Sequence, residues 1–286
     1  MRITKYCGSA FGFGSKHQAV TSDNKNNGAQ GGQSGREKTS DIMSEEEKAK
    51  RDAAISEHVY GKGGELPEGV RLVTPEELSE LKLNGVEFED SGSGFKSAHY
   101  IDENAGSYIY AFAGTDPKNL TGDLATNAEE GIGRFSFQHD LAVLNTETII
   151  SKVGAGNLSL TGHSLGGGLT SLATLVTGVK SNTFNAAGLH KNTIKKHGGM
   201  RNASKVNAYY VKGEWLHTMQ TEPTFGRFSA KVGNLIELPS TRTIRNVPYY
   251  FGAAGYAIVT GMNASSRMGM HGIGDVKSAL ENRGNN

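Results

Sequence analysis

The stretch from Asn157 to Leu169, Asn-Leu-Ser-Leu-Thr-Gly-His-Ser-Leu-Gly-Gly-Gly-Leu, constrains the fold of this chain more than any other. Leu158 and Leu160 alternate with polar residues as in a short buried strand, and the apolar residues from Leu169 onward have helical spacing. Ser164 stands in the glycine-rich turn between the two. A strand, a tight turn and a helix with a serine at the turn are what a nucleophile elbow requires.

Two glycines flank this serine, and both support the elbow hypothesis. Gly162 and Gly166 would let the strand and the helix approach without a Cβ clash, while the turn holds Ser164 in a strained conformation at the positive end of the helix. With 39 glycines in the chain, the motif can also arise by chance, and Ser164 would then only cap a helix. The strand before and the helix after favour catalysis.

Length, charge and cysteine content limit the classes of protein to which this chain can belong. A chain of 286 residues suits one domain with appendages, and a net charge of +1 with scattered basic residues predicts no nucleic-acid partner. The single cysteine, Cys7, excludes an internal disulfide. No apolar run approaches the ~20 residues of a membrane helix. No apolar segment follows Arg2 and Lys5, so we expect no cleaved signal peptide and either a cytosolic protein or a different export route.

Composition divides the chain into three parts. Residues 1–43 are polar and glycine-rich and are predicted to be a disordered N-terminal tail, which is either passive or a segment for export or partner binding. Residues 44–90 are predicted to be a helical lead-in packed on the main domain. Its helices start at capping boxes, Ser44 to Glu47 and Thr74 to Glu77, and are expected to end near Tyr60 and at Asn84-Gly85.

Residues 91–286 alternate strands with helices. We predict strands at 95–101, 107–113, 158–162, 181–186, 205–211 and 235–238, and helices at 137–153, 169–176, 191–197 and near the C-terminus. The second of these strands is almost entirely apolar, as a central strand covered on both faces would be. The pattern predicts an α/β fold with a mainly parallel central sheet and helices on both faces, the α/β-hydrolase arrangement once the elbow is included.

A serine nucleophile needs a histidine as base, and after an elbow the chain order is serine, acid, histidine. The candidates are His190, His197, His217 and His271. The first two follow the elbow too soon, and His217 shares one short loop with the nearest acid. His271 lies in a glycine-rich loop ahead of an amphipathic helix, where a loop can reach the sheet edge, so it is the predicted base.

Glu214 is the predicted acid because it follows the strand that ends at Val211, at a glycine-containing bend. The alternative for Glu214 is a solvated charge at a strand end. Asp275 is the rival acid, and we expect it instead to cap the C-terminal helix. The oxyanion hole is predicted from the N–H groups of Leu165 and Thr115, with the Thr115 hydroxyl as a further donor.

No set of residues has the spacing of metal ligands. Asp123 and Asp140 could bind a metal only within a cluster of ligands, which the sequence lacks, and both are interpreted as structural. No metal and no cofactor are therefore predicted.

Five segments carry a resemblance to a known family. They are Ser93–Phe95, Ala111–Thr115, Gly162–Leu169, Thr183–Gly188 and His271–Ile273. From about Asp90 onward the chain resembles the class 3 lipase family of α/β-hydrolases, and more closely the bacterial secreted A1-type phospholipases. The resemblance implies acyl-ester hydrolysis of phospholipids, with Ser164 as nucleophile, His271 as general base and Glu214 at the acid position.

The chain departs from that family at two places. The relatives carry aspartate where Glu214 stands, and they pair an aspartate with a tryptophan where this chain has Asp123-Leu124. The second departure falls in residues 117–134, the expected lid or acyl-site rim. The resemblance also implies export from the cytoplasm without a cleaved signal. The first hypothesis is therefore a lipolytic serine hydrolase that acts on phospholipids at a membrane surface, and an exported toxin with an accessory or neutralising partner protein is a further alternative.

Two other classes of function stay open at this point. The same triad would serve a soluble esterase or acyltransferase, and the fold without activity would serve as a binding module. Aromatic and apolar residues at 249–259 fit an acyl site or a bilayer contact as well as they fit a core.

Overall fold

The computed structural model describes residues 43–114, 128–221, 229–242, 266–267 and 269–283. Contacts within the chain group it into two units, Met1–Ser40 and Asp41–Asn286. The first unit, and with it the predicted tail, lies outside the described residues. All that follows concerns the second unit.

Eight strands of the described residues form one sheet, in the order β1-β3-β4-β5-β6-β8-β10 with β2 paired to β3. Their bounds are β1 Val70–Leu72, β2 Glu89–Asp90, β3 Phe95–Asp102, β4 Ser107–Phe112, β5 Leu158–His163, β6 Ser181–Phe184, β8 Val206–Val211 and β10 Asn234–Leu238. The five strands from β4 to β10 run parallel, while β1 and β2 pair with β3, and β3 with β4, in the antiparallel sense. A separate antiparallel pair joins β7 (Leu189–His190) to β9 (Ser229–Ala230).

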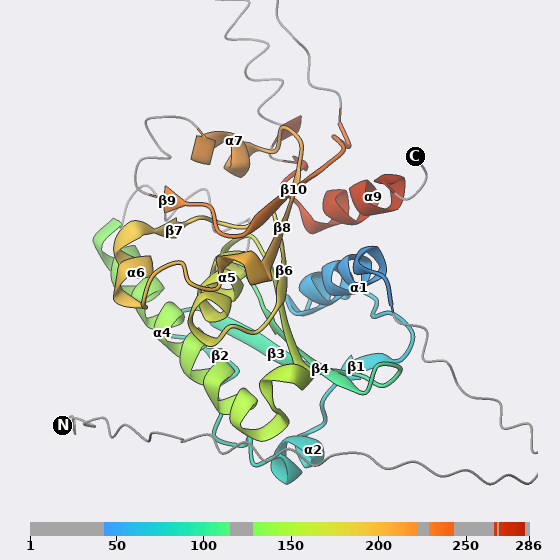
Figure 1. The fold of residues 1–286 in the computed structure, drawn as a ribbon, viewed down its shortest axis with the longest axis vertical. Coiled ribbons are helices and arrows are strands. Elements are labelled where there is room, and N and C mark those ends of the chain that lie inside the picture. Colours follow the sequence, from blue (N-terminus) through green and yellow to red (C-terminus); the bar gives the residue numbers. More distant parts are fainter. Residues whose placement is uncertain (1–42, 115–127, 222–228, 243–265, 268, 284–286) are drawn as a thin grey trace, which may run out of the picture. The chain divides into compact units, whose positions relative to one another are not determined.

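Helices cover both faces of this sheet (Figure 1). The helices are α1 Glu45–His58, α2 Pro75–Glu80, α4 Ala128–Val153, α5 Leu165–Thr177, α6 Lys191–Lys196, α7 Trp215–Thr221 and α9 Ile273–Arg283. Helices α1 and α9 pack side by side on one face, and α4 and α5 on the other. Single 3-10 turns at Ala155–Asn157 and Ala203–Lys205 lead into β5 and β8. The predicted α/β fold class is thereby confirmed.

Each face of the sheet has its own apolar core. Between the sheet and α4 and α5, the fully buried side chains include Phe112, Leu160 and Leu169. On the opposite face, Phe184 and Val276 belong to a core that joins α1 and α9 to the ends of β6, β8 and β10. Strand β4 is buried on both faces, which is why its sequence is almost continuously apolar.

The segment before residue 91 is part of the same unit. Strands β1 and β2 pair with β3, and α1 packs against the elbow strand β5. Helix α1 also carries a buried polar network: Arg51 bonds the carboxylates of Asp52 and Asp102, and Asp52 accepts a hydrogen bond from Asn182 of β6 at 2.8 Å. Residues 44–90 thus contribute strands as well as helices to this unit.

Both predicted capping boxes are present, but two helix boundaries differ from the prediction. Helix α2 ends at Glu80, because Lys82 takes a left-handed conformation (φ 55°) and the N–H of Leu83 turns back to the carbonyl of Leu78. Helix α4 begins at Ala128, nine residues before the predicted start at Phe137, so part of the expected connection is helical.

Candidate active site

The elbow has the backbone geometry that a nucleophile requires. Strand β5 ends at His163, α5 begins at Leu165, and Ser164 between them has φ 57° and ψ −125°. A non-glycine residue in this region costs on the order of 1–3 kcal/mol, so its surroundings must hold it. The N–H of Ser164 donates to the carbonyl of Phe184 at 3.0 Å, and its own carbonyl accepts from Ala187 at 2.9 Å. Strand β6 and the loop after it thus fix the strained residue.

The two predicted elbow glycines lie where no side chain fits. A Cβ on Gly162 would come within 2.4 Å of the carbonyl oxygen of Gly166. A Cβ on Gly166 would come within 2.1 Å of the carbonyl oxygen of Phe112, at the end of β4. Because both obstacles are backbone atoms, the close contact of β4, β5 and α5 depends on glycine at these positions.

The structure brings Ser164, His271 and Glu214 into one hydrogen-bonded line. Nε2 of His271 lies 2.9 Å from Oγ of Ser164, and Nδ1 lies 3.1 Å from Oε2 of Glu214. All three are buried, and Glu214 is completely inaccessible to solvent. Since an ionised carboxylate only accepts, Nδ1 carries the ring proton of the neutral histidine and Nε2 accepts from the serine hydroxyl. This is the arrangement of a base ready to take the serine proton.

Glu214 is held by the first turn of α7. Its carboxylate accepts hydrogen bonds from the N–H of Leu216, at 2.8 Å, and from the N–H of His217. These two bonds fix the orientation of the carboxylate at the start of the helix. The ring of Trp215 lies edge-on to that of His271, with ring centroids 5.5 Å apart.

Asp275, the rival acid, is engaged elsewhere. It lies in the first turn of α9, where its carboxylate accepts from Thr241 at 2.7 Å and from Arg242 at 2.9 and 3.0 Å. The prediction that it caps the helix is wrong, because α9 begins at Ile273 and the side chain turns to the preceding segment.

The other candidate bases lie apart from Ser164. His190 caps α6, and His197 lies 3.2 Å from Asp140, which also pairs with Lys196. His217 stacks on Tyr210, with ring centroids 3.7 Å apart.

The predicted oxyanion site is described only in part. Leu165 follows the nucleophile directly, and a Cβ built on Gly114 would lie 3.2 Å from its nitrogen, so the end of β4 reaches the elbow as expected. Thr115, the segment 117–127 with Asp123, and the residues at 243–265 lie outside the described residues.

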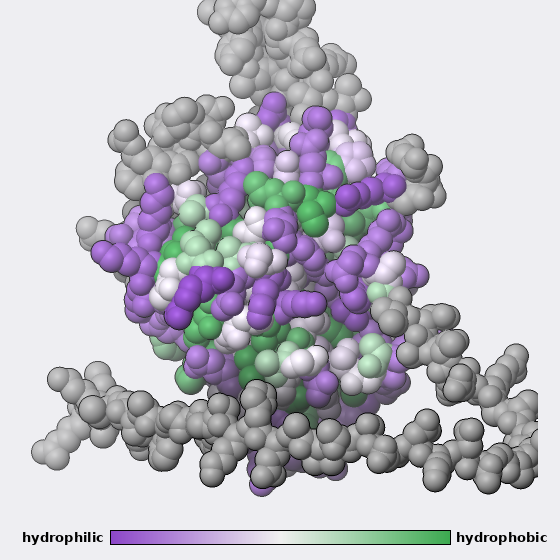
Figure 2. Space-filling view, in the orientation of Figure 1, coloured by the Kyte–Doolittle hydropathy of each residue, from purple (hydrophilic) through white to green (hydrophobic). Residues whose placement is uncertain are grey.

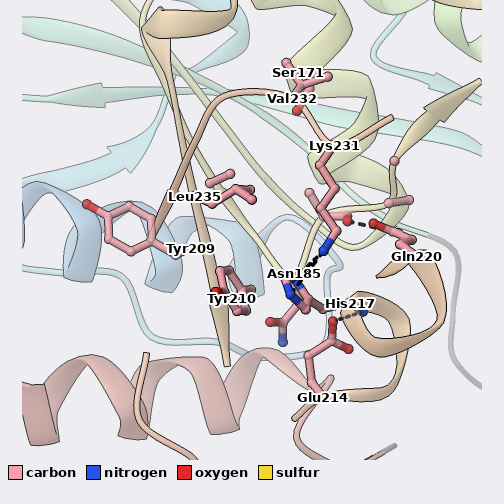
Figure 3. Close-up of a pocket in the computed structure, with 14 residues that line it drawn as sticks. Ser171, Asn185, Tyr209, Tyr210, Glu214, His217, Gln220, Lys231, Val232 and Leu235 are labelled. Atoms are coloured by element: carbon pink, nitrogen blue, oxygen red, sulfur yellow. Dashed lines mark hydrogen bonds between the residues drawn. The ribbon is translucent and has the colours of Figure 1, made fainter. Parts of the chain in front are cut away.

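Glu214 also lines a pocket formed by residues of β8 and α7, by residues 185–188 and by Lys231, Val232 and Leu235 (Figure 3). Nζ of Lys231 reaches the His217 ring there, at 3.0 and 3.1 Å from its two nitrogens. Burial lowers the pKa of Lys231, and burial together with Lys231 lowers the pKa of His217, while the negative charge of Glu214 opposes both shifts.

Five large apolar side chains are exposed among the described residues: Leu72 in β1, Phe137 and Leu144 seven residues apart in α4, Met200, and Leu235 in β10. Hydrophobic and hydrophilic residues also alternate on the face seen in Figure 2. Among the described helices, none is long and apolar enough to cross a membrane. The same residues contain no group of three or more side chains placed to hold a metal ion.

Sequence reasoning missed two polar residues that contact the base. His163 and Asn185 both hydrogen-bond the main-chain carbonyl of His271. His163 lies in the segment Gly162–Leu169 and Asn185 in Thr183–Gly188, two of the segments that carry the family resemblance. Neither a histidine nor an asparagine predicts such a contact from its residue type alone.

The fold is that of an α/β-hydrolase, because the sheet is mainly parallel and has helices on both faces. Its site is of the serine type, since a serine in a strained elbow lies in line with a histidine and a buried acid. Residues 51–265 match the family model described as a Tle-like phospholipase domain. The chain belongs to this family.

Individual proteins show similar relationships. Over 156 residues the chain is 33% identical to the extracellular phospholipase A1 of Serratia liquefaciens, an alignment that covers 54% of this chain and 47% of that one. The chain thus spans about half the length of this curated relative. Among solved structures, a triacylglycerol lipase from Penicillium expansum is 15% identical with a TM-score of 0.45, covering 68% of this chain and 80% of that one. A Rhizomucor miehei lipase–propeptide complex is 12% identical with a TM-score of 0.38, covering 63% and 79%.

Proposed function

We propose that this chain is a phospholipase that cleaves acyl esters of phospholipids through an acyl-enzyme on Ser164. The observation that carries the proposal is the hydrogen-bonded line from Ser164 through His271 to Glu214, inside a domain of the Tle-like phospholipase family. A buried acid that is hydrogen-bonded to a histidine, which in turn is hydrogen-bonded to a serine, is an arrangement that activates the serine as a nucleophile.

In the first half of the reaction, His271 takes the proton of Ser164 as Oγ attacks the ester carbonyl. Glu214 holds the ring in the correct tautomer and stabilises the imidazolium that forms. The N–H of Leu165 donates to the oxyanion, and Thr115 is the second donor that we propose. His271 then protonates the leaving alcohol, here a lysophospholipid.

In the second half, water replaces that alcohol. His271 takes a proton from the water as the water oxygen attacks the acyl carbonyl, and returns it to Oγ of Ser164 as the acyl–Oγ bond breaks and the fatty acid leaves. No metal is required for either half, because the general base, its orienting acid and the oxyanion donors all come from the chain.

Phospholipid as the substrate is supported by the family and by the name of the Serratia relative. The test is product analysis after incubation with a phospholipid that carries two distinguishable acyl chains. We expect a free fatty acid and a lysophospholipid from the wild type and neither from Ser164→Ala. Turnover of a short monomeric ester alone would identify a soluble esterase, and hydrolysis by Ser164→Ala would overturn the mechanism.

We further propose that the protein acts outside the cell that makes it, supported by the extracellular relative, and that it leaves the cytoplasm without losing a signal peptide. The intact mass of protein recovered from the medium tests this, since cleavage would remove N-terminal residues. An enzyme that cleaves phospholipids endangers the membranes of its producer, so we also propose a neutralising partner protein. Purification from the native producer should yield that partner bound.

A further inference from the structure

The main-chain carbonyl oxygen of His271 accepts hydrogen bonds from two side chains outside the triad. Nε2 of His163 lies 2.6 Å from this oxygen, and Nδ2 of Asn185 lies 3.0 Å from it. Both side chains are buried, with His163 4% and Asn185 1% exposed. We propose that Asn185 and His163 are positioning residues that hold His271 in line between its acid and its nucleophile. This inference rests on the proposed function and assigns two further residues to it.

Asn185 connects the loop of the base to the strand that carries the acid. Its Nδ2 donates also to the carbonyl of Met270 at 3.0 Å, and its Oδ1 accepts from the N–H of Val211 at 3.0 Å. Val211 ends β8, and Glu214 follows three residues later. The amide orientation is fixed, because only its oxygen can accept from Val211. One side chain therefore sets the distance between the segments that carry base and acid.

The backbone of Asn185 explains why asparagine suits this position. Its φ of 43° lies in the left-handed region, which asparagine adopts more readily than most residues. Its N–H donates to the carbonyl of Tyr209 at 2.8 Å, so the conformation is also tied to β8. Glycine would reproduce the backbone without the side chain, and this separates the two contributions in an experiment.

His163 supplies the second bond without adding a charge. A carbonyl oxygen only accepts, so Nε2 of His163 carries the ring proton, and its Nδ1 accepts from the hydroxyl of Tyr60 at 3.0 Å. Burial is the main reason why the pKa of His163 falls to about 3. The ring thus stays neutral near pH 7, although it lies 5.1 Å from the ring of His271. A charged His163 would oppose the imidazolium that catalysis requires.

The consequence is a loss of turnover when either bond is removed. A displacement of about 1 Å at a catalytic group can lower the rate on the order of 100-fold. Because the two bonds act on the base and not on the substrate, we expect the loss in kcat and not in KM.

The test compares four variants with the wild type on a short soluble ester. Asn185→Gly and His163→Phe each remove one of the two bonds to the carbonyl of His271, and Asn185→Gly also removes the bonds to Met270 and Val211; each should lower kcat by about 10- to 100-fold, with KM within about threefold. His163→Gln keeps an N–H at similar reach and should recover most of the loss. The matched control is Asn182→Ala, three residues earlier on β6, which removes a buried hydrogen bond to Asp52 away from the site. It should lower Tm and leave kcat within about twofold.

A second readout follows the base independently of turnover. The Nδ1 proton that His271 shares with Glu214 gives a far-downfield proton NMR resonance. It should persist in Asn182→Ala and be lost or shifted in Asn185→Gly. If Asn185→Gly keeps the wild-type kcat and the wild-type resonance, the proposed role of Asn185 is wrong. If His163→Phe and His163→Gln have equal activities, the proposed role of His163 is wrong. Ser164→Ala, assayed in parallel, reports separately on the proposed function.

Discussion

Oε2 of Glu214 lies 3.1 Å from Nδ1 of His271, although the family resemblance led us to expect the shorter aspartate at this position. The additional methylene is accommodated because the same carboxylate also accepts from the N–H groups of Leu216 and His217 at the start of α7. The orientation of the Glu214 carboxylate thus depends on the N-terminus of α7 as much as on the length of the side chain.

Glu214→Gln should lower kcat on the order of 1,000- to 10,000-fold, as the loss of the orienting charge does in other triads. Glu214→Asp keeps the charge but cannot reach both α7 and His271 from the same backbone position, so we expect an intermediate loss. Steady-state kinetics on a short ester measures both. Turnover of Glu214→Gln close to that of the wild type would remove Glu214 from the mechanism.

Gly166→Ala should disrupt the elbow. The new Cβ would lie 2.1 Å from the carbonyl oxygen of Phe112 and 2.7 Å from the carbonyl carbon of Ala113, so the start of α5 must move away from β4. We expect a lower Tm together with a loss of kcat.

Gly274→Ala is the matched control, because a Cβ there meets no other atom within 4 Å. It lies in α9, where alanine is favoured over glycine by about 1 kcal/mol, so Tm should stay unchanged or rise. An equal response of the two variants in thermal unfolding would show that the contact with β4 does not decide the effect.

His99 should make the protein less stable in acid. It is buried in β3, neither of its ring nitrogens has a hydrogen-bond partner among the described residues, and burial lowers its pKa to about 4. Below pH 6.5 the unfolded chain therefore binds a proton that the folded chain does not, and stability falls as pH falls from 6.5 to 4. The shift corresponds to about 3 kcal/mol at the lower end.

The measurement is urea unfolding of the wild type and His99→Phe at pH 7.5, 5.5 and 4. The variant should gain stability relative to the wild type as pH falls, because phenylalanine takes up no proton in the unfolded state. His163 contributes an acid dependence of the same sign to both proteins and cancels in the comparison. A constant difference across the three pH values would contradict the assignment.

Arg51→Met should be strongly destabilising. The guanidinium pairs with Asp52 at 2.8 Å and with Asp102 at 2.9 Å, and both carboxylates are buried. Removing it leaves two uncompensated acids, a change that costs about 3–5 kcal/mol.

The control is Lys196→Met, which breaks the exposed pair with Asp140 and should cost less than about 1 kcal/mol. Free energies of unfolding from urea titration compare the two. A loss of similar size in both variants would show that burial of the Arg51 network is not what matters.

Much of this arrangement was predictable because the relevant signals are local. The capping boxes at Ser44 and Thr74, the apolar strand β4 and the strand–turn–helix around Ser164 are short-range patterns, and the structure contains all of them. Chain order left four histidines, and the positions of His271 in a late glycine-rich loop and of Glu214 after a strand end selected the two residues that the structure places in line with the serine.

What sequence reasoning missed depends on contacts between distant segments. Asn185 donates a hydrogen bond to the carbonyl of His271, 86 positions away, and no sequence pattern around an asparagine predicts such a partner. Helix α7 and the pair β7–β9 are too short for periodicity to distinguish them from loops. Helix α1 resembled an appendage because its sequence is polar, yet Arg51 and Asp52 are buried through an ion network that composition cannot show.

The pairing of α1 with α9 can form only late in synthesis. These helices come from opposite ends of the described chain and lie together on one face of the sheet, where Lys277 also reaches Glu57 at 2.7 Å. The ribosome delivers Ser164 107 residues before His271, and the loop of His271 leads directly into α9. A nascent chain therefore contains Ser164 without His271, and the hydrogen-bonded line of the proposed triad cannot form until the segment that leads into α9 has emerged.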